Sequence, residues 1–77
     1  MEKGKGGLEL QVFGNRRAVA DGCDGIVDYG EGQVVLRAGR LWVKLTGEGL
    51  CLERLTSSSA VVEGKILQVE YAYGERG

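Results

Sequence analysis

Apolar and polar residues alternate along much of this chain with the two-residue period of half-buried β-strands. The clearest case is Arg40–Thr46, where leucine and valine share one face while Trp42 and Lys44 lie on the other. Leu8–Phe13 repeats the pattern. No stretch shows a helical period for more than one turn. The alternation therefore predicts an all-β protein.

Turn residues divide the apolar runs into seven or eight short strands. The chain contains 14 glycines and no proline. The strands expected from the pattern are Leu8–Phe13, Arg16–Ala20, Ile26–Tyr29, Gln33–Arg37, Arg40–Thr46, Leu50–Leu55, Ala60–Val62 and Ile66–Tyr73. Gly47–Gly49 and Glu63–Lys65 are predicted to be turns between strands, because glycine accepts the backbone angles that turns require. Leu55 falls out of phase with Leu50 and Leu52, which predicts a bulge or an early strand end.

The short connections favour a mostly antiparallel meander that forms a sandwich, a roll or an open barrel. Short strands at near-regular intervals also permit a solenoid-like stack as an alternative. At 77 residues the chain has room for one domain, which we expect at residues 8–73. Met1–Gly7 is predicted to be a flexible segment, and residues 74–77 a short tail.

Composition indicates a soluble, globular domain, with 43% hydrophobic and 27% charged residues. The formal net charge is -1, from 10 basic and 11 acidic side chains, so no general attraction to nucleic acid or anionic lipid is expected. The N-terminus lacks the apolar core of a signal peptide, and no apolar run approaches the roughly 20 residues that span a bilayer. We therefore expect a cytoplasmic protein without direct membrane insertion. A domain this small often depends on oligomerisation for stability.

The residue types that usually build catalytic and metal centres are sparse. Histidine is absent, which removes the commonest general base and the commonest metal ligand. Cys23 and Cys51 stand far apart without a CxxC pair, so zinc binding has little support. We expect a small buried side chain at Cys51 and a partly exposed thiol at Cys23. No cofactor, metal site or catalytic residue is predicted.

Acidic residues offer two weaker possibilities. One group lacks the alternating ligands of a calcium loop and is better explained by turn-stabilising side chains, namely Asp21, Asp24 and Asp28. A hydrolytic enzyme would depend only on Glu53, Glu63 and Glu70, which no sequence motif brings together. We therefore expect a protein that is not an enzyme.

Trp42 is the strongest candidate for a functional side chain. It points away from the main apolar face, close to Val35 on the preceding strand and flanked by Arg37 and Lys44. One interpretation is a second core layer, as in a sandwich. Another is an exposed aromatic patch rimmed by charge, which would anchor a partner. A third is base stacking by a single-strand nucleic-acid-binding module on a small barrel.

The order of these segments resembles the YabP/YqfC family of sporulation proteins, and YqfC-like members most closely. The matching elements are Gly14-Asn15-Arg16 after the first strand, Gly25–Tyr29, Val34–Leu36, Gly39–Gly47, Leu50–Leu52, Val61–Ile66 and Val69–Tyr71. Each element alone is unspecific, but the order and spacing of the elements together match the family from about Leu8 to Tyr73. The similarity therefore covers nearly the whole chain.

The resemblance implies a structural or assembly protein of endospore formation that acts in the mother cell. The resemblance implies no catalytic residues, because none are known for the family. It also implies a membrane-bound sporulation protein as a partner, which would place this chain at the forespore membrane only indirectly. Together with the residue pattern, it leads us to expect a protein-interaction module. That module would use free sheet edges and the surface of Val35, Arg37, Trp42 and Lys44, with itself as a further partner.

Overall fold

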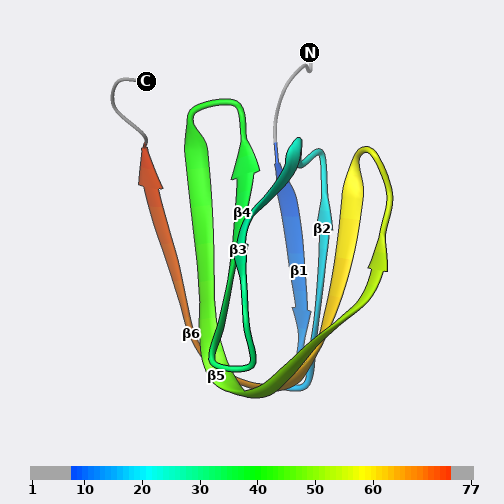
Figure 1. Ribbon diagram of the computed structural model, residues 1–77, viewed down its shortest axis with the longest axis vertical. Coiled ribbons are helices and arrows are strands. Elements are labelled where there is room, and N and C mark those ends of the chain that lie inside the picture. The colour runs from blue at the N-terminus through cyan, green and yellow to red at the C-terminus, as the bar shows by residue number, and fades with distance from the viewer. Residues whose placement is uncertain (1–7, 74–77) are drawn as a thin grey trace.

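The computed structural model describes residues 8–73, which form six β-strands (Figure 1). The strands are β1 (Glu9–Phe13), β2 (Arg17–Asp21), β3 (Gly25–Tyr29), β4 (Gln33–Ala38), β5 (Leu41–Leu55) and β6 (Ser59–Tyr73). Within this range there is no helix long and apolar enough to cross a membrane. The all-β prediction is confirmed. The predicted flexible segment 1–7 and the tail 74–77 lie outside the described residues.

All neighbouring strands pair antiparallel in the order β1-β2-β6-β5-β4-β3, which excludes the solenoid alternative. The two central strands, β5 and β6, have 15 residues each and bend near their middles, so that one sheet folds over itself (Figure 1). The first layer contains β1, β2, the first part of β6 and the last part of β5. The second layer contains β3, β4, the first part of β5 and the last part of β6.

The predicted turns at Gly47–Gly49 and Glu63–Lys65 are wrong, because both stretches are bends inside continuous strands. At these points β5 and β6 stay paired, with Glu48 opposite Lys65 and a register shift on either side. The eight predicted strands are therefore present, but β5 and β6 each combine two of them, which gives six strands. The predicted irregularity near Leu55 is confirmed by a register shift between Leu52 and Arg54.

The core lies between the two layers and consists of the side chains on their inner faces. The second layer contributes four of the five largest fully buried side chains, and the first contributes mostly alanine, which lets the layers approach. The buried core members are Ala18, Ala20, Cys23, Val34, Leu36, Val43, Leu45, Leu50, Ala60, Val62 and Ile66. No polar or charged residue in the described range is buried. Apolar burial is therefore the main stabilising term.

Hydrogen bonds fix the β3–β4 turn against the bend of β5. The backbone N–H of Gly47 donates to the carbonyl of Gly32 over 3.0 Å, and that of Leu50 donates to Glu31 over 2.9 Å. Further along β5, the Leu52 N–H donates to the hydroxyl of Tyr29 over 3.2 Å. These contacts tie the β3–β4 turn and the Tyr29 side chain to β5 on one side of the sandwich.

Candidate functional site

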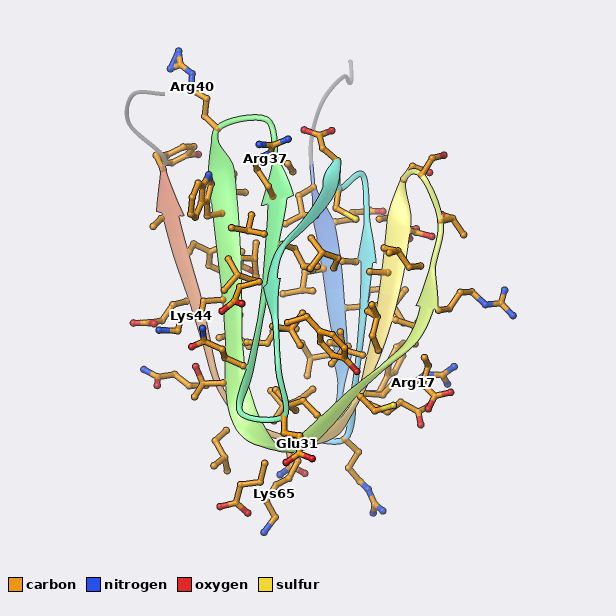
Figure 2. The ribbon with its side chains drawn as sticks, in the orientation of Figure 1. Arg17, Glu31, Arg37, Arg40, Lys44 and Lys65 are labelled. Carbon is orange, nitrogen blue, oxygen red and sulfur yellow. The ribbon has the colours of Figure 1, made fainter. Side chains whose placement is uncertain are left out.

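The four residues singled out in the sequence form one continuous patch on the outer face of β4 and β5, which we call the Trp42 surface. The antiparallel register places Val35 opposite Lys44 and Arg37 opposite Trp42. Directly opposed residues project on the same face of a sheet, so the four side chains are neighbours. Figure 2 shows Arg37 and Lys44 extending from this part of the second layer. Strand alternation alone is enough to place these residues together.

Trp42 lies beside a buried apolar residue on the outer face but is itself exposed to solvent. Its side chain is 39% exposed, whereas Val35 beside it is only 8% exposed. On the β6 side the register places Ala72 next to Trp42, and this small side chain leaves the indole open to solvent. A shallow pocket of about 420 Å³ lies here, and Val27 of β3 contributes to its lining. The interpretation of Trp42 as part of a second core layer is therefore wrong.

The charges around the Trp42 surface alternate in sign. One row across the sheet runs from Asp28 of β3 through Val35 and Lys44 to Glu70 of β6. Asp28 also accepts a hydrogen bond from the Gln33 side-chain amide over 2.7 Å, which fixes its carboxylate at this edge. Arg37 lies in the next row, between Gly25 and Trp42. Two cations and two carboxylates thus surround one indole, with no excess of either sign.

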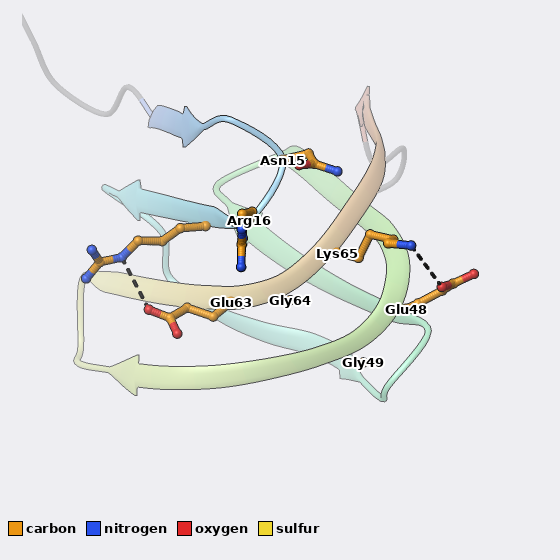
Figure 3. Close-up of a pocket in the computed structure, with 8 residues that line it drawn as sticks. Asn15, Arg16, Glu48, Gly49, Glu63, Gly64 and Lys65 are labelled. Carbon is orange, nitrogen blue, oxygen red and sulfur yellow. Dashed lines mark ion pairs between the residues drawn. The ribbon is translucent and has the colours of Figure 1, made fainter.

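A second, larger pocket of about 710 Å³ lies at the bend, and Gly49 and Gly64 contribute to its lining (Figure 3). Two ion pairs line this pocket. Arg17 Nε lies 3.6 Å from Glu63 Oε2, and Lys65 Nζ lies 3.8 Å from Glu48 Oε1. All four side chains are exposed, so these pairs contribute little stability.

The acidic residues considered in the sequence stay apart. Glu63 pairs with Arg17, whereas Glu70 lies opposite Lys44 in the other layer. Asp24 accepts a hydrogen bond from the backbone N–H of Gly39 over 2.6 Å, which ties the β2–β3 connection to the β4–β5 turn. Among residues 8–73 no three His, Cys, Asp or Glu side chains gather closely enough to hold a metal ion.

The two cysteines have the opposite exposure to the one predicted. Cys23 is buried at 3% exposure, and Cys51 is exposed. The loop of Cys23 is held down by the carbonyl of Ser58, which accepts hydrogen bonds from the N–H groups of Gly22 and Cys23. Burial raises the pKa of the Cys23 thiol, and the nearby carboxylates of Asp24 and Asp21 add to the shift. Cys51 lies on the outer face, opposite Glu63.

The sequence did not identify the unpaired edge formed by β1 and the last part of β6. There the inner-face residues Val12 and Tyr71 are 40% and 57% exposed. Alternation places both on the apolar side of their strands, but exposure depends on which strands end up at the sheet edges. The positions of Asp28 and Glu70 in the row of Lys44 were missed because they too depend on the order of the strands. The order of strands in the sheet would have revealed all four.

Two comparisons with known proteins address the identity of the chain. The model of the YabP family matches residues 5–77, which is almost the whole sequence. A comparison with curated proteins finds no match.

Proposed function

The chain belongs to the YabP family, and we propose that it is a non-enzymatic structural or assembly protein of endospore formation. Family membership indicates a sporulation-related protein. In this proposal the domain binds other proteins through the Trp42 surface and the free edges of its sheet. Its partners are a membrane-bound sporulation protein and further copies of itself. It acts in the mother-cell cytoplasm and reaches the forespore membrane only through its partner.

The observation that carries the proposal is the open indole of Trp42 above the buried Val35. Aromatic side chains that combine apolar area with a polar rim are typical anchors of protein interfaces. Arg37 and Lys44 on one side, with Asp28 and Glu70 on the other, supply a rim that can pair with either charge. A protein surface with mixed charges fits this rim well.

The same charges make a nucleic acid a poorer occupant. Affinity for a phosphate backbone comes from cations without opposing carboxylates. On this face Lys44 lies directly opposite Glu70, and Asp28 belongs to the same row. Retardation of a single-stranded oligonucleotide at low salt would favour the nucleic-acid alternative over ours.

Substitution of Trp42 by lysine is expected to reduce capture of the membrane-bound partner strongly. The tagged protein is incubated with a detergent extract of sporulating cells, and retained membrane proteins are identified by mass spectrometry. We expect the wild type to retain a membrane-spanning sporulation protein and Trp42→Lys to retain about tenfold less, because loss of a tryptophan anchor commonly exceeds 1.4 kcal/mol.

The matched control is Leu55→Lys, which introduces the same charge at a side chain that is 50% exposed on the last part of β5. It is expected to capture the partner as well as the wild type does. Equal capture by Trp42→Lys would show that the Trp42 surface does not bind the partner. If the wild type retains no membrane protein, the proposed partner is wrong.

A further inference from the structure

The two sides of the sandwich differ in how their edges are joined. On one side, hydrogen bonds tie the β3–β4 turn and the Tyr29 side chain of β3 to β5, as described above. On the other side lie β1 and the last part of β6, which are unpaired edges of the sheet. Figure 1 shows these two strands separating from the bend toward the far end of the molecule. We call this the open side.

Apolar side chains of the inner faces reach solvent at the open side. Val12 is opposite Ala18 and Tyr71 is opposite Val43, and both of these neighbours are buried core residues. Val12 and Tyr71 therefore point inward, yet they remain 40% and 57% exposed. An inner face that is exposed along two unpaired strands combines apolar area with free backbone donors and acceptors.

A hydrogen bond at the bend aligns the end of β1 with the start of the last part of β6. At the bend, the Ile66 N–H donates to the carbonyl of Asn15 over 2.8 Å, just beyond the end of β1. Between this contact and the regular strands lie the turn at Gly14 and the irregularity at Leu67, so the contact sets the level of β1 against β6 rather than a continuous ladder. At that level, one alignment sets the inner residues of β1 against the inner residues of β6. It places Val12 opposite Val69, Leu10 opposite Tyr71 and Leu8 opposite Tyr73.

The outer faces are also compatible in this alignment. It places Glu9 opposite Ala72, Gln11 opposite Glu70 and Phe13 opposite Gln68, so that no like charges meet. A slip of one residue would set inner side chains against outer ones. A slip of two residues in one direction would place Glu9 opposite Glu70. The opposite slip would set Val12 against Tyr71 and Leu10 against Tyr73 without like charges, so the side chains leave two pairings and the level of β1 at the bend selects between them.

We propose that two copies of the chain associate with their open sides facing, each β1 pairing antiparallel with the last part of β6 of the second copy in this register. The inference rests on the self-association in the proposed function and specifies its surface. Pairing is reciprocal, so two identical ladders form around a two-fold axis and both edges of the open side are used in each copy. Within one chain the two strands stay apart, because fully buried side chains such as Leu36 and Leu45 already fill the space between the layers.

Disulfide trapping tests the register. In a Cys51→Ser background, which removes the exposed thiol, Gln11→Cys and Glu70→Cys are combined in one chain. Both positions are exposed on the outer face, so folding is expected to be preserved, and circular dichroism checks this. The new thiols of two copies would face each other at the about 5 Å separation of opposed residues, which a disulfide spans. We expect mild oxidation to give a product of twice the chain mass on a non-reducing gel.

The control combines Gln11→Cys with Gln68→Cys, which the register places on a diagonal about 7–8 Å apart. It is expected to cross-link at least fivefold less. Equal cross-linking of the two variants, or no dimeric product, would overturn the register. Loss of both new thiols in a product at the mass of one chain would show instead that the strands close within the monomer. Failure of this test would not contradict the proposed capture of a partner, because capture through Trp42 is measured in a separate experiment.

Discussion

Replacement of Gly47 by alanine is expected to lower the free energy of unfolding by about 4 kcal/mol or more, which would leave much of the protein unfolded. A Cβ at this position would lie 1.9 Å from the carbonyl oxygen of Lys65 and 2.9 Å from its carbonyl carbon. The obstacle is backbone of the paired strand, which cannot rotate away as a side chain can. Relief would require separating β5 from β6 at the bend that forms both layers.

Two other glycines separate this steric effect from general effects of the substitution. Gly25→Ala meets no atom within 4 Å and is expected to change stability by less than about 0.5 kcal/mol. Gly49→Ala also has open space, but its φ of +61° costs a side chain roughly 1 kcal/mol. Urea unfolding followed by Trp42 fluorescence measures all three. A Gly47→Ala protein as stable as Gly25→Ala would contradict the close approach of the two strands.

Replacement of Leu45 by alanine is expected to lower the free energy of unfolding by about 2–5 kcal/mol, through lost apolar burial and the cavity that remains. Leu45 is fully buried and lies between Val34 of β4 and Val69 of β6, in the middle of the second layer. A chain of this size has a total stability of only about 4–12 kcal/mol, so the variant is expected to be partly unfolded at 37 °C.

Leu67→Ala is the matched control, because it removes the same atoms from a side chain that is 61% exposed. Thermal unfolding followed by circular dichroism compares the two variants. We expect Leu67→Ala to stay within about 0.5 kcal/mol of the wild type. Similar losses in both variants would mean that Leu45 does not lie in the core.

Local alternation was sufficient to assign the faces of the strands. Residues 41–46 illustrate this, because Val43 and Leu45 are fully buried and Trp42 and Lys44 point outward as the two-residue period predicts. The Trp42 surface followed from the same pattern, since one short turn fixes the register of β4 against β5.

The bends and the edges were not predictable from local pattern. A glycine stretch such as Gly47–Gly49 has the same composition whether the chain reverses there or continues paired through a bend. The outcome depends on Glu63–Lys65, which lies opposite in β6. The exposure of Cys23 likewise depends on Ser58, which is distant in sequence and holds its loop against the core. Each error arose where contacts between distant segments decide the structure.

In our proposal, a second copy of the chain completes the open side of the sheet. The most direct test is the molar mass in solution, measured by light scattering over a range of protein concentrations. We predict that the wild type approaches twice the chain mass, and that Trp42→Lys does the same. Tyr71→Lys is predicted to remain at the chain mass, because its ammonium group would be buried between the paired strands. A wild-type protein that stays at the mass of one chain at every concentration would contradict the account.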